Sequence, residues 1–513
     1  MSRIATRDES LPLSTLIVLT FALTLATFMQ VLDTTIANVS IPSISGDLGV
    51  TPSQGTWIIT SFAVSNAISM PLTGWLARRF GEVKLFVLSV FLFSMTSLMC
   101  GIASNFEMLI IGRILQGAVA APMMPLSQSL LLSNYPTHKK GLALAFWSMT
   151  ATIGPIVGPL LGGYITDNFS WSWIFFINIP IGVFSSIIVW AAIKHRETDK
   201  KKDPIDYVGL MLLVIGVGSL QILLDKGNDL DWFSSDIIVW LSIATGVGLL
   251  FLVVWELFDD HPVIDLSLFG NRNFAVGAIA ITLGYTVFLG GGVVFPLWLQ
   301  LDMGYTAYWA GYASAAVGIF AFLLSPVIGT QMHKMNLRLL VSVSFVLFAI
   351  SYFMMSGFTT QVDLSHVAMP RLVMGIAMAM FFIPLTAIIL SQVEQSRVAS
   401  AMGLVNFIRV LGGSFGTSIG VSIWDRWSAV HHSDLASVVT PFSHTAMQYK
   451  EGLSQIISKP EAFIDFLVTK QALTMSNDDI LYLSGIVFLA MIPILWLAKP
   501  PFITSKAKAP VLE

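Results

Sequence analysis

The pentapeptide Arg113-Ile-Leu-Gln-Gly117 returns 258 residues later as Arg371-Leu-Val-Met-Gly375. A looser match links Gly74 with Gly329 at an offset of 255 residues. Three glycines spaced by four residues also return at the first offset: Gly154, Gly158 and Gly162 as Gly412, Gly416 and Gly420. Several matches at one fixed offset indicate two structurally related halves.

The composition around these repeats excludes an ordinary soluble protein. Hydrophobic residues make up 55% of the 513 positions, whereas charged residues make up only 11%. Such a balance is typical of membrane proteins. The net charge of −3 gives no reason to expect nucleic acid as a partner. Because Cys100 is the only cysteine, an intramolecular disulfide and a metal cluster built on cysteines are both excluded.

Fourteen apolar runs reach the length of about 20 residues that a helix needs to cross a bilayer. We predict spans at 13–37, 54–77, 85–103, 107–132, 142–165, 173–193, 207–225, 236–256, 274–297, 307–329, 339–357, 367–390, 400–424 and 479–498. The predicted fold is an all-α integral membrane bundle of two six-helix repeats plus two inserted central helices. The predicted parts are an N-terminal bundle at 1–195, a linker with the two extra helices at 196–256, and a C-terminal bundle at 257–513 with a long periplasmic loop at 425–479.

Lysine and arginine predict the orientation, because they accumulate in cytoplasmic loops. Nineteen lie in the tails and in every second loop: Arg3, Arg7, Arg78, Arg79, Lys84, Lys139, Lys140, Lys194, Arg196, Lys200, Lys201, Lys202, Arg272, Lys334, Arg338, Arg397, Lys499, Lys506 and Lys508. Five lie on the other side: Lys226, Arg426, Lys450, Lys459 and Lys470. Both termini are therefore predicted to be cytoplasmic.

Asp33 lies within the first predicted span, where an ionisable residue is costly and indicates function. At 1.5 Å per residue it lies about 12 Å from the outer end of its helix, if that helix ends near Ile41. Arg113 lies about 10 Å from the same surface. We therefore predict that Asp33 and Arg113 are neighbours that couple transport to proton movement. The alternatives are a permanent ion pair that fixes helix packing, or an aspartate that caps a helix break.

The repeat predicts that only one half carries this carboxylate, because Asp33 aligns with Gly291 at the offset of 258. Polar residues at helical spacing surround the pair in sequence and predict a face turned toward other helices or water. Arg371 and Arg409 have no intramembrane carboxylate in their own half, so they bind backbone or an anionic substrate; for Arg371, near a helix end, snorkelling or packing is favoured. The predicted lining of the substrate cavity is Gln30, Thr34, Gln116, Gly117, Met124 and Arg409.

The fifth predicted span contains Gly154-Pro155-Ile-Val-Gly158-Pro159-Leu-Leu-Gly162-Gly163. Glycine at every fourth residue makes a flat face for close helix contact, and proline removes backbone donors, so we predict a mechanical role. The loop after the second span predicts a cytoplasmic gate built from Gly74, Arg78, Arg79, Gly81 and Lys84. Simple anchoring by positive charge explains these cations equally well.

Motifs for nucleotide hydrolysis and for metal binding are missing from the sequence. It contains no Gly-Lys-Ser/Thr phosphate loop, no His-Glu-x-x-His and no paired cysteines. We therefore predict no enzyme activity, no cofactor and no metal, and energy supplied by a gradient. A membrane enzyme for lipid-linked substrates would need a group of acidic or histidine residues at one membrane face, and His431, His432 and His444 are the only hint of one.

Five motifs together resemble a known family: Leu32-Asp33-Thr-Thr-Ile-Ala-Asn38-Val-Ser-Ile-Pro42, Arg113 with Gly117, Gly154 to Gly163, Trp171-Ser-Trp-Ile-Phe-Phe-Ile-Asn178-Ile-Pro180, and Asp206-Tyr-Val-Gly209. The family is the major facilitator superfamily, specifically its fourteen-helix drug/proton antiporters of the EmrB type. Arg78 departs from the pattern, because many relatives place an acidic residue there, so a latch that uses this carboxylate is not expected.

The resemblance implies proton-driven efflux, across the cell inner membrane, of hydrophobic or amphipathic toxic compounds such as drugs, uncouplers or fatty acids. It associates Asp33 and Arg113 with proton transfer, and Gly154, Pro155, Gly158, Pro159, Gly162 and Gly163 with antiport. It also implies a periplasmic adaptor protein and an outer-membrane channel as partners, beside membrane lipid. The alternative is a dedicated exporter or importer of one metabolite.

Overall fold

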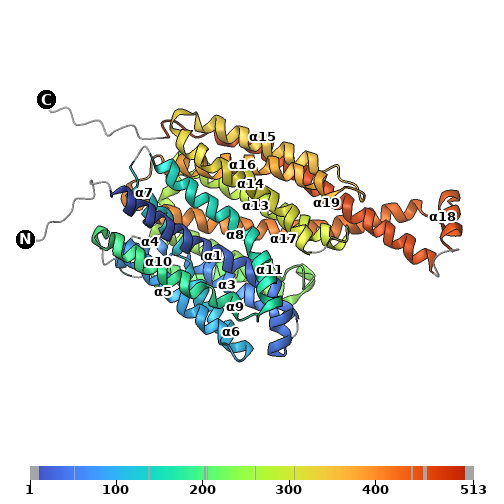
Figure 1. Cartoon of the computed structure of the whole chain (residues 1–513), viewed down its shortest axis with the longest axis horizontal. Coiled ribbons are helices and arrows are strands. Elements are labelled where there is room, and N and C mark those ends of the chain that lie inside the picture. The colour runs from blue at the N-terminus through green and yellow to red at the C-terminus, as the bar shows by residue number, and fades with distance from the viewer. Residues whose placement is uncertain are drawn as a thin grey trace, which may run out of the picture.

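The computed structural model describes residues 11–50, 52–136, 139–200, 204, 206–259, 262–305, 307–440, 443–454 and 459–502. These residues form helices and connecting turns, without a strand (Figure 1). Twelve helices in this part of the chain are long and apolar enough to cross a membrane. The all-α membrane class predicted from the sequence is thereby confirmed.

The described residues of the N-terminal half form ten α-helices, and some of the predicted spans contain more than one of them. They are α1 (Leu13–Leu48), α2 (Pro52–Gly55), α3 (Trp57–Ser69), α4 (Thr73–Phe80), α5 (Glu82–Gly101), α6 (Phe106–Ala120), α7 (Met123–Asn134), α8 (Lys140–Asn168), α9 (Trp173–Phe176) and α10 (Asn178–Ile193), followed by the 3₁₀ turn η2 (Lys194–Arg196).

The inserted pair and the C-terminal half follow. The pair is α11 (Tyr207–Lys226), η3 (Trp232–Ser234) and α12 (Asp236–Phe258). The second half is η4 (Leu266–Gly270), α13 (Arg272–Leu301), α14 (Ala307–Gln331), η5 (Met332–Lys334), α15 (Leu337–Met355), α16 (Leu364–Leu390), η6 (Gln395–Arg397), α17 (Val398–Val438), α18 (His444–Ser454) and α19 (Pro460–Trp496).

The predicted span at 54–77 is not one helix, since α3 ends at Ser69 and α4 begins at Thr73. Pro71 lies in this break, where its missing N–H cannot continue a helical ladder. Pro122 separates α6 from α7 within another predicted span in the same way. The short α3 and the helix α8 occupy the two predicted spans that the twelve long apolar helices do not include.

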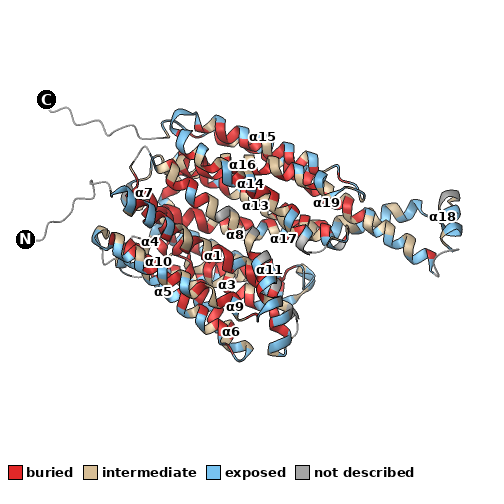
Figure 2. Ribbon diagram, viewed as in Figure 1, coloured by how far each residue is buried: buried red, intermediate tan, exposed pale blue. Residues whose placement is uncertain are grey.

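The segment 425–479 was predicted as a loop, and this prediction is wrong for most of its length. α17 continues to Val438, and α19 begins at Pro460, so the two helices and α18 extend beyond the bundle as a hairpin. Figure 1 shows this hairpin at one end of the molecule, opposite the side where α1 begins and α19 ends. Its surface is mostly exposed (Figure 2). We call its end the hairpin side and the opposite end the terminus side.

Equivalent glycines give the true register between the halves. Gly117 packs against the backbone at Phe62, and Gly375 against that at Val317, so α3 and α14 correspond at an offset of 255.

On α8, Gly158 packs against Thr35 of α1. On α17, the corresponding Gly416 packs against Thr286 of α13, so α1 and α13 correspond at an offset of 251. By the contacts with α8 and α17, Asp33 corresponds to Gly284, seven residues from the predicted Gly291. Between Thr286 and Val317 the second half has four residues more than the first half has between Thr35 and Phe62, so one constant offset cannot relate all the helices.

The halves contact each other on the terminus side. There the backbones of Gly141 on α8 and Gly329 on α14 approach too closely to admit a side chain. Gln128 of α7 also accepts a hydrogen bond from Asn406 of α17 at 2.9 Å.

On the hairpin side the inserted pair links the halves. Asp225 of α11 accepts a hydrogen bond from Thr60 of α3. Next to η3, Asn228 donates to Asp425 of α17 at 2.9 Å, and Trp232 donates to Ser422 at 3.1 Å. α11 and the turn that follows it therefore contact both bundles.

Candidate functional site

The predicted contact between Asp33 and Arg113 is present in the first half. Nη1 of Arg113, on α6, donates to Oδ2 of Asp33, on α1, at 2.7 Å. Both side chains are enclosed, with exposed fractions of 0% for Asp33 and 1% for Arg113. The depth estimate behind this prediction was wrong in one respect, because α1 continues as a helix beyond Ile41 to Leu48.

Further donors complete the site around the carboxylate. Asn178 of α10 donates to Oδ1 of Asp33 at 2.9 Å, and Gln116 donates to the same oxygen at 3.3 Å. Arg113 also donates to Gln116 at 2.7 Å. Ser97 of α5 accepts hydrogen bonds from both amides, at 3.2 Å from Gln116 and 3.0 Å from Asn178. Four helices thus converge on one buried charge.

The guanidinium of Arg113 is held on its remaining sides. Its Nε donates to the carbonyl oxygen of Ile58 at 2.9 Å, and its face lies over the ring of Phe62 at 4.3 Å from the centroid. Breaking such a pair by removing one partner costs about 3–5 kcal/mol, because the other charge stays buried. The site is a buried ion pair held by several hydrogen bonds.

Sequence reasoning missed Ser97 and Asn178 as members of this site. Asn178 carried a usable signal, because it is the only side-chain amide in the predicted span 173–193 and a buried amide in a membrane needs a partner. Ser97 carried none, since α5 also contains Ser89 and Ser94 in the same apolar run.

The second half repeats the arginine without the carboxylate. Arg371 is 5% exposed, and its guanidinium lies 3.8 Å from the ring centroid of Phe295. Its Nη1 lies 3.7 Å from the sulfur of Met374, which stands where Gln116 stands in the first half. Gly284, which corresponds to Asp33 in the register of α1 and α13, packs against Phe381, ten residues along α16 from Arg371. Arg371 is packed rather than snorkelling, and no ion pair with it occurs among the described residues.

Arg409 lies in the interior of α17, with an exposed fraction of 5%. Its Nη2 lies 3.0 Å from the sulfur of Met124 on α7, so two of the predicted cavity residues meet across the two halves. Three aromatic rings surround the guanidinium, from Trp147, Tyr285 and Phe382.

The other predicted cavity residues do not form one group. Gln116 belongs to the ion-pair network, and Gly117 is pressed against α3, where Asn66 donates to its carbonyl oxygen at 3.2 Å. Gln30 is buried, whereas Thr34 is exposed and donates to the carbonyl oxygen of Val31. Whether these residues line a cavity stays a prediction.

The glycine motif of α8 lies against α1 beside Asp33. Gly154 packs against Val31, and Gly158 against Thr35, with no room for a side chain. Gly162 is buried, while the space beside Gly163 is open. Pro155 and Pro159 lie outside the residues whose side chains the structure describes. The two described contacts hold α8 to the helix that carries the carboxylate.

The predicted gate loop contacts the other half and the linker. Arg78 donates to the hydroxyl of Ser400 on α17 at 3.1 Å, and Gly74 packs against the same residue. Gly81 has φ +92°, a conformation that favours glycine. Glu197 accepts from the backbone N–H of Lys84 at 2.9 Å and thereby caps the start of α5. Arg79 lies over the ring of Trp75, its neighbour on α4.

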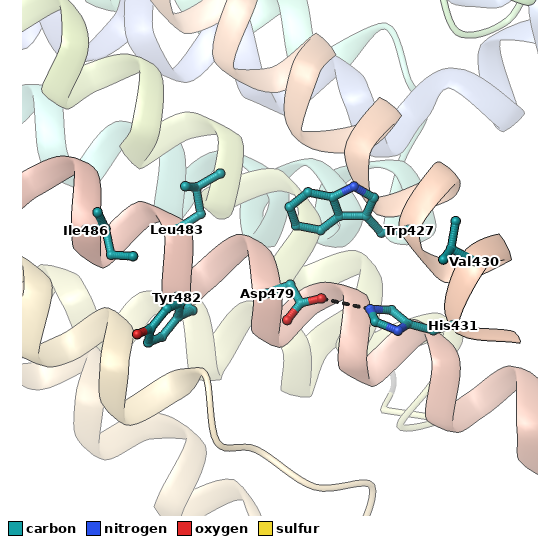
Figure 3. A pocket seen from close by; sticks show the side chains of 7 residues that line it. All are labelled: Trp427, Val430, His431, Asp479, Tyr482, Leu483 and Ile486. Carbon is teal, nitrogen blue, oxygen red and sulfur yellow. Dashed lines mark hydrogen bonds and ion pairs between the residues drawn. The ribbon is translucent and has the colours of Figure 1, made fainter. Parts of the chain in front are cut away.

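A shallow groove lies where the hairpin leaves the bundle (Figure 3). Its volume is about 370 Å³, and it is lined by Trp427, Val430, His431, Asp479, Tyr482, Leu483 and Ile486. His431 bonds to Asp479 at 2.8 Å across the hairpin, and His432 bonds to Asp465 at 3.1 Å. The side chain of His444 lies outside the described part. Each described histidine of the enzyme alternative thus contacts one carboxylate, and the described residues contain no group suited to a metal ion.

Comparison with known proteins places the chain in a family. The model of the Major Facilitator Superfamily matches residues 23–417. The multidrug export protein EmrB of Haemophilus influenzae is 50% identical over 494 residues, which cover 96% of this chain and 97% of that protein. EmrB of Escherichia coli K12 is 50% identical, covering 95% and 96%. The fatty acid resistance protein FarB of Neisseria gonorrhoeae is 49% identical, covering 94% and 96%.

The fold agrees with this assignment. The crystal structure of the human organic anion transporter MFSD10 matches with a TM-score of 0.58 and 12% identity, covering 92% of this chain and 98% of the other. The chain is thus a multi-pass membrane protein that belongs to the major facilitator superfamily, as an EmrB-like multidrug efflux transporter.

Proposed function

We propose that this protein exports hydrophobic or amphipathic toxic compounds in exchange for protons that bind at Asp33. The single observation that carries the proposal is the asymmetry between the halves. Asp33 and Arg113 form a buried ion pair in the first half. The second half holds Arg371 at the corresponding place of α16, over the ring of Phe295 and without an ion pair among the described residues.

The second half acts as an internal control for the packing alternative. There an arginine stays buried over Phe295 without a paired carboxylate among the described residues. The scaffold therefore tolerates this arginine without an aspartate. A buried carboxylate costs free energy within a membrane, so its presence in one half supports a role that requires a group able to bind a proton.

Protonation changes the balance of the site. When Asp33 binds a proton, the negative charge that faces Arg113 disappears, and the ion pair becomes a hydrogen bond between the guanidinium cation and a neutral carboxyl group. Substrate and proton then drive alternating access between the halves, as in transporters built from repeats. Each inward proton supplies about 2.3 kcal/mol per 100 mV of membrane potential.

A continuous set of contacts supports transmission from Asp33 to the interface between the halves. Thr35, two residues beyond Asp33, packs against Gly158 of α8. At the other end of α8, Gly141 meets Gly329 of α14 on the terminus side. A shift of α1 relative to α8 therefore moves the helix that closes this side.

The orientation and the partners belong to the same proposal. The excess of lysine and arginine supports cytoplasmic termini in an inner membrane, so the hairpin of α17 and α19 faces the periplasm. An exposed helical hairpin on that side suits contact with an adaptor protein that leads to an outer-membrane channel. Relatives named for multidrug export and fatty acid resistance support drugs, uncouplers or fatty acids as substrates.

The proposal is tested by uphill efflux in proteoliposomes with an imposed pH gradient. Asp33→Asn keeps the size of the side chain and removes its titration, so we expect gradient-driven efflux to disappear while the protein stays folded. Asp33→Glu, which retains a titratable group, is expected to keep part of the activity. Gradient-driven efflux at the wild-type rate by a folded Asp33→Asn protein would contradict the proposal.

A further inference from the structure

Arg409 is a buried cation that no described carboxylate neutralises. Its side chain is 5% exposed, and its Nε has no hydrogen-bond partner among the described atoms. It lies eleven residues from Val398, where α17 begins, which is about 17 Å at 1.5 Å per residue and near the centre of a bilayer of about 30 Å. An uncompensated charge at that depth is costly and marks a functional site.

The surroundings of Arg409 are soft and aromatic rather than ionic. The ring centroids of Tyr285, Phe382 and Trp147 lie 5.1, 5.8 and 5.9 Å from its guanidinium carbon. The sulfur of Met124 lies 3.0 Å from Nη2. Aromatic faces and a thioether stabilise a cation weakly and leave its N–H donors available to a stronger acceptor. Such walls also suit the apolar part of a ligand.

Both halves contribute to this group, which distinguishes it from Arg371. Met124 and Trp147 belong to α7 and α8 of the first half, whereas Tyr285 and Phe382 belong to α13 and α16 of the second. One turn closer to the terminus side, Asn406 donates to Gln128 at 2.9 Å and joins the halves directly. The site is therefore assembled and taken apart when the halves move relative to each other. Arg371, in contrast, is packed on Phe295 and Met374 within a single half.

The repeat gives Arg409 no counterpart. At the offset of 258 that relates α8 to α17, its position corresponds to Ala151. The first half thus contributes the carboxylate Asp33, and the second half contributes a cation between the bundles.

We propose that Arg409 binds the anionic headgroup of the exported compound, and that the transporter prefers amphipathic organic anions such as carboxylates. The guanidinium offers a planar fork that matches a carboxylate, while Trp147, Tyr285 and Phe382 contact the apolar body of the substrate. This inference rests on the proposed function, which already includes fatty acids, and adds the residue that selects anions among its substrates. It also predicts the charge movement: one anion outward and one proton inward transfer two positive charge equivalents inward in each cycle.

The test compares two ligands with the same chain, decanoate and decyltrimethylammonium, by equilibrium binding to purified protein in nanodiscs. Arg409→Gln is expected to weaken decanoate binding at least tenfold and to leave decyltrimethylammonium binding unchanged or tighter. Arg409→Lys keeps the charge but loses the planar fork of the guanidinium. Its affinity for decanoate is expected to lie between those of the wild type and Arg409→Gln. Arg371→Gln is the matched control, for which we expect wild-type binding of decanoate.

Unchanged decanoate affinity in Arg409→Gln, or an equal loss of both ligands in a protein with the wild-type melting temperature, would overturn the assignment. If Arg409→Gln does not fold, the folded Arg409→Lys variant provides the test. A loss of decanoate affinity relative to decyltrimethylammonium affinity supports the assignment, and an unchanged ratio overturns it. Asp33→Asn separates the two proposals, because it is expected to bind decanoate while losing coupling to protons. Decanoate binding that depends on Arg409 in a transporter without proton coupling would support the anion site and contradict only the proposed energy source.

Discussion

The two halves place an arginine at the same point of the same helix and surround it differently. Arg113 meets Asp33 and Gln116, whereas Arg371 meets Phe295 and Met374. Among the described residues, no carboxylate pairs with Arg371. The comparison teaches that this scaffold can bury the cation with or without a counter-charge. The counter-charge in the first half is therefore not needed merely to bury an arginine at this point.

The largest expected effect is the difference in stability loss between substitutions of the two arginines. Arg113→Met leaves Asp33 buried without its ion partner, so we expect the free energy of unfolding to fall by about 3–5 kcal/mol at neutral pH. Arg371→Met removes a cation that has no counter-charge, and the lost contact with Phe295 is worth only about 1–2 kcal/mol. Equilibrium unfolding of both variants in mixed micelles measures the difference. Equal losses would mean that the two sites do not differ electrostatically.

A second comparison concerns the glycine contacts on α8 and α17. A methyl group at Gly416 meets backbone atoms of Thr286, while one at Gly158 meets the side chain of Thr35, which can rotate. Overpacking costs about 1–3 kcal/mol, so we expect Gly416→Ala at the upper end and Gly158→Ala at the lower end. Thermal unfolding tests this order. A larger loss for Gly158→Ala would place the more rigid contact in the first half.

A smaller effect is expected from the amide beside the carboxylate. Asn178→Ala removes a donor to Oδ1 of Asp33, and donors favour the ionised form. The pH at which coupled efflux is half-maximal should therefore rise, while the maximal rate changes by less than about tenfold. Efflux measured across a pH series tests the shift. A substitution beside the arginine of the second half, Met374→Ala, is expected to leave the pH profile in place.

The smallest effect concerns a carboxyl group outside the spans, at the end of α13. Burial raises the pKa of Asp302 from its ordinary value of 3.8, and a hydrogen bond from Thr474 opposes the rise. The folded protein then binds a proton more tightly than the unfolded chain, so stability falls as the pH rises above about 4 toward the folded pKa. Asp302→Asn should flatten this slope. Melting temperatures of both proteins between about pH 4 and pH 7 measure it, and an unchanged slope in the variant would contradict the assignment.

Much of this architecture could be predicted from hydropathy. Backbone N–H and C=O groups find no water within a bilayer, so a chain of apolar runs must cross it as helices that satisfy their own hydrogen bonds. The contact of Asp33 with Arg113 was also predictable, although α1 continues to Leu48 rather than ending near Ile41. The register of the repeat was not, because loop lengths differ between the halves and shift Asp33 from Gly291 to Gly284.

Three other features were hidden for different reasons. The segment 425–479 has the polar composition of a loop, but it forms helices that pair along their length outside the bundle, where no apolar run is needed. Ser97 joins the site only through its place on α5, since serine is common on that helix and its hydroxyl gives no pattern. The aromatic group around Arg409 collects residues from five helices, which no spacing along the chain reveals.

The central claim is that Asp33 carries the proton that a bound substrate releases. The direct measurement is proton release into weakly buffered solution, followed with a pH indicator, when sodium decanoate adjusted to the pH of the solution is added to purified protein. We expect release from the wild type and from Arg371→Gln, and none from folded Asp33→Asn. Wild-type proton release from the Asp33→Asn variant would contradict the account.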